Sequence, residues 1–229
     1  MPAGRSPGYR AVLFDALGTL VELEPPWPFL VRALSDRHGI DVTEADAKQA
    51  LVAEMAYYRA HHHEGSDEES LADLRRRCSL ILHERLPETA PVSVDDLTEV
   101  LLDSLRFAPF PDAAPALASL RTRGIRLAVV SNWDCSLRSV LAGLGLAAAV
   151  DEVVVSAEVG ALKPDPRIFA VALEKLRCAP SEALFVGDSI ETDVLGAHAA
   201  GMRALLLDRG GGGAGSQDGE RIFSLNDLV

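Results

Sequence analysis

Short apolar runs recur along most of the chain, and each is too short to form a helix. They are bounded by turns and polar residues, as buried β-strands are, and cover residues 11–14, 125–130, 152–155, 183–186 and 203–207. Segments with apolar residues at helical spacing lie between them, at residues 113–123, 137–144, 166–177 and 193–200. Because helices alternate with strands, the pattern predicts an α/β fold with a doubly wound parallel sheet and right-handed crossovers.

The segment from residue 24 to residue 107 has a different pattern, because no strand-like run interrupts its helical periodicity. Proline-rich stretches at residues 24–28 and 107–111 bracket it, and proline neither continues a helix nor sits inside a sheet. We therefore predict a core made of residues 1–23 and 108–229. A smaller all-helical domain of three to five helices is expected between these two parts.

Polar residues mark the starts of several predicted helices. Thr43 is followed by Glu44 and Asp46, which is typical of a helix N-cap with acidic residues in the first turn. Asp112 is likewise expected to cap the helix at residues 113–123.

The glycine-rich stretch at residues 210–216 is expected to be a loop and not a phosphate cradle, because it lacks the Lys-Ser/Thr ending of a P-loop.

Composition and charge restrict the possible partners. Of the 229 residues, 48% are hydrophobic and 24% are charged, which is ordinary for a globular protein. The net charge of −12 argues against nucleic acid or a membrane as a partner, because both call for a basic surface, but it does not exclude a small anionic substrate. No apolar run reaches the roughly 20 residues of a membrane span. The scattered cysteines Cys78, Cys135 and Cys178 and the lack of a signal-like segment predict a cytoplasmic protein.

Residues capable of chemistry follow the predicted strands. Asp15 ends the first strand, Ser131 and Asn132 follow the second, and Asp188 follows the fourth, with Asp193 nearby. An unpaired carboxylate at the end of a buried strand is costly, so Asp15 is the first candidate for a functional role. The carboxyl ends of parallel strands lie along one edge of the sheet, where ligands bind. We therefore expect these side chains to converge.

Together with Lys163, these residues supply the parts needed to transfer a group through an aspartate. A carboxylate can attack and carry the group covalently, while a hydroxyl and backbone N–H groups hold the oxygens of the transferred group. A lysine neutralises negative charge. Two further carboxylates can hold Mg²⁺, which prefers hard oxygen ligands.

Four motifs occur in order along the chain. They are Asp15-x-x-Gly18-Thr19-Leu20, Val130-Ser131-Asn132, Gly160-x-x-Lys163-Pro164-Asp165-Pro166-x-Ile168-Phe169 and Val186-Gly187-Asp188-Ser189-x-x-x-Asp193-Val194-x-Gly196-Ala197-x-x-Ala200-Gly201-Met202. Together they resemble the motifs of the haloacid dehalogenase superfamily. The resemblance implies a Rossmann-like core, a helical (C1-type) cap at residues 24–107 that closes over a small-molecule substrate, and a phosphatase-like hydrolase.

The resemblance also implies a role for each matching residue. Asp15 would be the nucleophile, Ser131 would hydrogen-bond to the transferring phosphoryl group, and Lys163 would bridge that group and the Asp15 carboxylate. The implied substrate-binding residues are Thr19, Ser131, Asn132 and Lys163. The implied Mg²⁺ ligands are Asp15, the backbone carbonyl of Leu17, Asp188 and Asp193. For Asn132 and Asp193, an N-cap role is the alternative, because each precedes a predicted helix.

One position departs from the family pattern. Most family phosphatases carry a second aspartate two residues after the nucleophile, which protonates the leaving oxygen and then activates water. This chain has Leu17 there, and leucine can do neither. General acid–base help is worth about 10²–10⁴ in rate, so the substitution affects the functional prediction.

Three functions remain open. The first is a phosphatase, monomeric or homodimeric, whose acid or base comes from elsewhere or whose leaving group needs no proton. Glu22 or a histidine of residues 61–63 could stand in, although that tract is otherwise expected to be an exposed helix end. The second is a dehalogenase-like enzyme, since halide leaves without a proton, but family dehalogenases lack the metal-type pair that Asp188 and Asp193 preserve. The third is a binding or regulatory protein with little turnover.

Overall fold

A computed structural model describes residues 8–211 and 220–228. It divides into two compact units, which we describe separately. The first unit, here called the core unit, comprises the chain up to Glu22 and from Pro109 onward. The second, the helical unit, is Leu23–Ala108.

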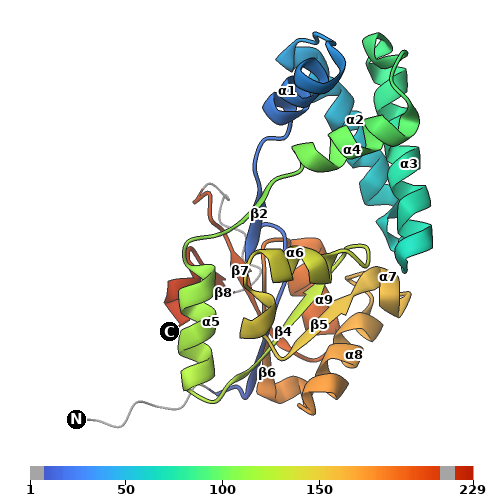
Figure 1. The fold of residues 1–229 in the computed structure, drawn as a ribbon. Coiled ribbons are helices and arrows are strands. Elements are labelled where there is room, and N and C mark those ends of the chain that lie inside the picture. Colours follow the sequence, from blue (N-terminus) through green and yellow to red (C-terminus); the bar gives the residue numbers. More distant parts are fainter. Residues whose placement is uncertain (1–7, 212–219, 229) are drawn as a thin grey trace. The chain divides into compact units, whose positions relative to one another are not determined.

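A six-stranded sheet forms the centre of the core unit (Figure 1). Its strands are β1 (Ala11–Phe14), β4 (Arg126–Ser131), β5 (Glu152–Val155), β6 (Ala183–Gly187), β7 (Arg203–Leu207) and β8 (Glu220–Ile222). Their order in the sheet is β5-β4-β1-β6-β7-β8, and every pair is parallel. Because β1 pairs with both β4 and β6, the residue that follows it lies at the middle of the sheet edge.

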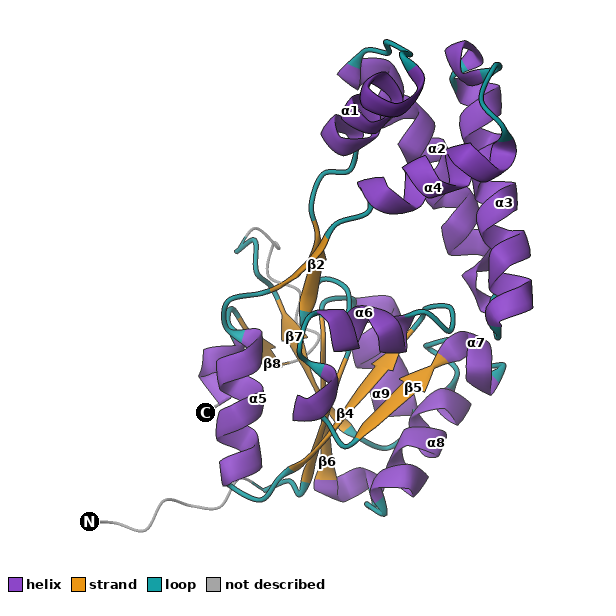
Figure 2. Cartoon of the chain, viewed as in Figure 1, coloured by secondary structure: helices purple, strands orange, loops and turns teal. Residues whose placement is uncertain are grey.

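Helices surround this sheet (Figure 2). They are α5 (Ala113–Thr122), α6 (Leu137–Gly143), α7 (Ser156–Val159), α8 (Pro166–Leu176) and α9 (Leu195–Ala199). Ala11 and Leu13 of β1 belong to an apolar cluster with residues of α8 and α9, such as Phe169. Val12 and Phe14 point to the opposite face and are equally buried, so both faces of the sheet are covered. The prediction of a doubly wound parallel α/β fold is confirmed.

The structure differs from the predicted elements in three places. It has a further strand, β8, which pairs with β7, whereas the last predicted strand was residues 203–207. The segment expected to form one helix at residues 193–200 begins in a π-helical turn, Ile190–Val194, whose N-cap is Ser189, and continues as α9. Asp112 makes no cap hydrogen bond to α5. The glycine-rich stretch falls largely on residues 212–216, outside the described residues.

The helical unit consists of four α-helices and two short 3₁₀ turns. The helices are α1 (Trp27–His38), α2 (Glu44–His61), α3 (Glu68–Arg85) and α4 (Val94–Ser104), and the turns are His62–Glu64 and Pro87–Thr89. Two short strands, β2 (Val21–Leu23) and β3 (Phe107–Pro109), pair where the chain enters and leaves this unit. As expected, Thr43 caps α2 by accepting a hydrogen bond from the Asp46 N–H.

The histidine tract is not a uniformly exposed helix end. His61 ends α2, while His62 and His63 lie in the following 3₁₀ turn. The prediction is wrong for His62, which is buried, because the tight turn directs its ring inward beside Tyr58. In the described part of the chain, no helix has both the length and the apolar character needed to cross a membrane.

Candidate active site

Asp15 lies directly after β1 and is buried, with 7% of its surface exposed. Its backbone N–H donates to the Val186 carbonyl at 2.9 Å, which continues the pairing of β1 with β6. One carboxylate oxygen, Oδ1, accepts hydrogen bonds from Lys163 Nζ at 2.5 Å and from the Ser131 hydroxyl at 3.0 Å. The structure therefore brings together the three residues that the sequence suggested for catalysis.

Lys163 lies in the loop between α7 and α8, and its ammonium group joins two carboxylates. Besides Asp15, it donates to Asp193 Oδ1 at 2.6 Å, and its side chain is 2% exposed. Asn132 fixes the lysine backbone, since its amide donates to the Lys163 carbonyl at 3.0 Å and accepts from the Lys163 N–H at 2.7 Å. The Asn132 side chain is thus engaged with this loop and caps no helix.

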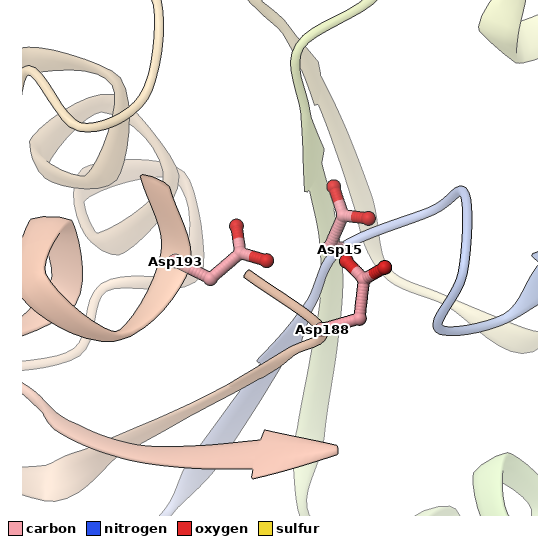
Figure 3. A group of neighbouring side chains, drawn as sticks. All are labelled: Asp15, Asp188 and Asp193. Carbon is pink, nitrogen blue, oxygen red and sulfur yellow. The ribbon is translucent and has the colours of Figure 1, made fainter. Parts of the chain in front are cut away.

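Asp188 and Asp193 complete a group of three carboxylates with Asp15. Oxygens of the three side chains lie within 4.8 Å of one another. Figure 3 shows that Asp15 and Asp188 extend from adjacent strand ends, while Asp193 approaches them from the helical turn. Ser189 provides the N-cap of that turn by accepting from the Thr192 N–H, and its own N–H donates to Asp193 Oδ2 at 3.1 Å. Asp193 is therefore aimed into the group and is not the cap residue.

Two glycines make room for these carboxylates. A Cβ atom at Gly18 would overlap the Asp188 carboxylate, and Gly18 also has a φ of +85°, which favours glycine. A Cβ atom at Gly187 would overlap the Asp193 carboxylate. Gly187 was not predicted to have a role of its own, although its position immediately before Asp188 at a strand end was a usable signal.

The electrostatics of the group favour an additional cation. Burial raises the pKa of Asp15, and Asp193 adds to that rise while Lys163 opposes it. Burial and the neighbouring carboxylates of Asp15 and Asp193 raise the pKa of Asp188 to about 6. Burial lowers the pKa of Lys163, but the two contacting carboxylates outweigh this and raise it. One ammonium thus faces three carboxylates, a donor set of hard oxygens that fits a divalent ion such as Mg²⁺.

The two remaining predicted site residues lie on the turn after Asp15. Leu17 is 41% exposed, so an apolar side chain reaches solvent where the family pattern has an acid. Thr19 is fully buried, and its Oγ1 has no hydrogen-bond partner among the described residues. Its carbonyl oxygen accepts from Arg209 at 2.7 Å, a contact that the sequence analysis did not anticipate.

Comparison with known proteins extends the resemblance from the four motifs to most of the chain. The model of a hydrolase family described as haloacid dehalogenase-like hydrolase matches residues 9–201. A mouse relative, haloacid dehalogenase-like hydrolase domain-containing protein 3, is 32% identical over 86% of this chain and 81% of its own. A glyceraldehyde 3-phosphate phosphatase of Methanopyrus kandleri is 32% identical over 88% of this chain and 84% of its own.

A solved structure agrees with these matches. The crystal structure of a HAD phosphatase from Thermococcus onnurineus superposes with a TM-score of 0.66 and 29% identity, covering 96% of this chain and 95% of its own. The family model spans most of the chain, from β1 to the residues just before β7, and includes all four motifs except Met202, the last residue of the fourth. The chain therefore belongs to the family of haloacid dehalogenase-like hydrolases.

Proposed function

We propose that this hydrolase is a Mg²⁺-dependent phosphatase that acts on a small phosphorylated metabolite through a phosphoaspartate at Asp15. The observation that carries the proposal is the convergence of Asp15, Lys163 and Ser131 beside the Asp188–Asp193 pair. A relative similar over most of this chain is named a phosphatase, and so is the solved structure that resembles it at 29% identity.

In the first step, a carboxylate oxygen of Asp15 attacks the phosphorus of the substrate. The bond between phosphorus and the ester oxygen breaks, and that oxygen leaves with the electron pair. The Ser131 hydroxyl and the Lys163 ammonium already contact the attacking carboxylate, so they are placed to hold phosphoryl oxygens as charge moves. In the second step water attacks the phosphorus, which releases phosphate and restores the carboxylate.

The proposed Mg²⁺ ligands are Asp15, Asp188, Asp193 and the backbone carbonyl of Leu17. The ion would supply positive charge against the transferring phosphoryl group, as metal ions do in phosphoryl transfer generally. The carboxylate spacing and the two glycines that accommodate Asp188 and Asp193 support this assignment.

Leu17 narrows the proposed substrate class. Because a leucine cannot protonate a leaving oxygen, we expect faster turnover with aryl or acyl phosphates, whose leaving groups need no proton, than with alkyl phosphates. Leu17 also favours a second candidate function, the displacement of halide from a haloacid, because a leaving halide needs no proton. The three clustered carboxylates argue against a dehalogenase, because they would repel an anionic haloacid. A metal-free displacement also needs only the nucleophilic aspartate and gives the other two no function.

We further propose that the helical unit is a cap that selects the substrate, and that the protein works in the cytoplasm. The assignment as a cap is supported by the internal contacts of Leu23–Ala108, which make this segment a compact unit of its own. The three cysteines are not paired in disulfides, which supports a cytoplasmic location. The strongly acidic sequence is a reason to expect a small molecule and not nucleic acid as the substrate.

A phosphate-ester panel assayed with Mg²⁺ and with EDTA, beside Asp15→Asn, tests the proposal. We expect phosphate release that needs Mg²⁺ and is lost in Asp15→Asn. Metal-independent halide release from 2-chloropropionate would replace the phosphatase by the dehalogenase. Inactivity across both substrate classes, with tight binding of some ligand, would identify a binding protein.

A further inference from the structure

A largely buried ion pair outside the carboxylate group connects distant parts of the core unit. Arg209 follows β7, and its two terminal nitrogens donate to the two oxygens of Asp112 at 3.0 and 2.9 Å. The side chains are 21% and 10% exposed. The guanidinium carbon also lies 3.8 Å from the centroid of the Phe110 ring. Phe110 belongs to the segment through which the chain returns from the helical unit.

Asp112 is held from several sides, which explains why it does not cap α5. Besides Arg209, it accepts hydrogen bonds from the Ser224 hydroxyl at 2.8 Å and from the Leu225 N–H at 3.0 Å. Burial raises the pKa of Asp112, but these donors outweigh it and the pKa is lowered. The carboxylate therefore stays ionised and gives Arg209 a fixed anchor.

The second contact of Arg209 leads to the active site. Nη2, which donates to Asp112, also donates to the Thr19 carbonyl at 2.7 Å. Thr19 lies in a tight turn in which the N–H groups of Leu20 and Val21 both donate to the Ala16 carbonyl at 2.9 Å. Ala16 is the residue after Asp15. The turn is further joined to the returning segment, because the Phe110 N–H donates to the Leu20 carbonyl at 3.0 Å.

The same turn sets the position of a proposed metal ligand. Gly18, next to Thr19, packs so closely on the Asp188 carboxylate that a Cβ atom there would overlap it. A shift of the turn therefore changes the space available to Asp188 and its separation from Asp15. A planar guanidinium can grip a carboxylate with both terminal nitrogens and still direct one N–H to a carbonyl, whereas a lysine ammonium lacks this fork.

We propose that Arg209 is a positioning residue of the active site. Anchored by Asp112, it holds the Thr19 carbonyl and so keeps Gly18 against Asp188 and fixes the spacing of the carboxylate group. The part of this inference that concerns metal binding and turnover rests on the proposed function, while the part that concerns the turn does not.

The test compares Arg209→Met and Arg209→Lys with Arg221→Met. Arg221 is a matched control, because it pairs with Asp208 at 2.9 Å with side chains 20% and 16% exposed, and it lies on β8, the edge strand three strands away from β1. Hydrogen–deuterium exchange measures the exchange rates of the backbone amides of residues 16–21, and calorimetry measures the Mg²⁺ dissociation constant. Steady-state kinetics with p-nitrophenyl phosphate and thermal unfolding complete the set.

We expect Arg209→Met to speed exchange in the turn and to weaken Mg²⁺ binding by about tenfold, the scale of one hydrogen bond to a charged group. Turnover should fall by a similar factor while KM changes little, and Arg209→Lys should not rescue it. Arg221→Met should lower the unfolding temperature without these effects.

Unchanged exchange at residues 16–21 in Arg209→Met would overturn the proposal. So would equal effects of Arg209→Met and Arg221→Met on Mg²⁺ binding, since these would reflect stability alone. If the wild-type protein shows no Mg²⁺-dependent phosphatase activity, the proposed function fails. The exchange data still decide whether Arg209 holds the turn.

Discussion

Replacing Leu17 by aspartate should restore a missing catalytic group. Leu17 lies two residues after Asp15, on the turn whose next residue packs on Asp188, and it is 41% exposed. Because the side chain is partly in solvent, its replacement opens no core cavity, and the stability cost should stay below about 1 kcal/mol. An aspartate there can protonate an alkyl leaving group and then activate water, which is worth about 10²–10⁴ in rate.

The assay measures kcat for an alkyl phosphate and for p-nitrophenyl phosphate at saturating Mg²⁺. Leu17→Asp should raise turnover of the alkyl phosphate by about 10²-fold or more, because both proton transfer to the leaving group and attack of water are assisted. The gain with the aryl phosphate should be smaller, because its leaving group needs no proton and only the attack of water on the phosphoaspartate is assisted. Leu17→Asn is the matched control, since it has nearly the same shape and polarity but cannot transfer a proton. Equal rates for Leu17→Asp and Leu17→Asn, with intact folding, would refute this account of the missing acid.

Three further predictions follow from individual contacts. Lys163→Met leaves buried carboxylates without their cation, so it should reduce turnover by at least about 10²-fold and destabilise the metal-free protein by about 3–5 kcal/mol, as calorimetry would show. Added Mg²⁺ should recover part of that stability, and no recovery would count against the metal assignment. Gly187→Ala should weaken Mg²⁺ binding because its methyl group would displace Asp193, whereas Gly143→Ala, where a methyl group meets nothing within 4 Å, should not. Burial raises the pKa of Glu54 in α2 above its unfolded value, so ionising it opposes folding and stability falls as pH rises from that unfolded value through the folded one. Glu54→Gln should therefore melt higher than wild type at pH 8 and show a flatter pH profile, and an equal or lower melting temperature there would contradict this.

The local sequence pattern was sufficient to predict an element where burial of apolar side chains alone determines its structure. The apolar run before Asp15 forms β1, because it is too short for a helix and a strand buried on both faces is apolar at every position. The position of Asp15 at the sheet edge follows from that strand. The convergence of Lys163 with it followed from the motif order, although Lys163 is 148 residues away along the chain.

Two features, the contacts of Asp112 and strand β8, were not predicted because they depend on residues far away in the sequence. Asp112 has the residue type and spacing of an N-cap, but its carboxylate instead accepts charge-assisted hydrogen bonds from Arg209 and a further one from the Ser224 hydroxyl. In the same way, β8 is a three-residue strand whose pairing depends on β7 already being in place. Neither partner can be read from the local sequence.

The charge balance of the site is the physical basis for preferring phosphoryl transfer over halide displacement. Lys163 contacts Asp15 and Asp193, and carboxylate oxygens of Asp15, Asp188 and Asp193 lie within 4.8 Å of one another. A metal-free displacement needs one ionised aspartate, and extra carboxylates beside it would raise its pKa and repel a carboxylate substrate. In the proposed phosphoryl transfer, the same carboxylates would be ligands of the divalent ion. Because Gly18 and Gly187 lack a Cβ atom, Asp188 and Asp193 can pack against them and keep this spacing.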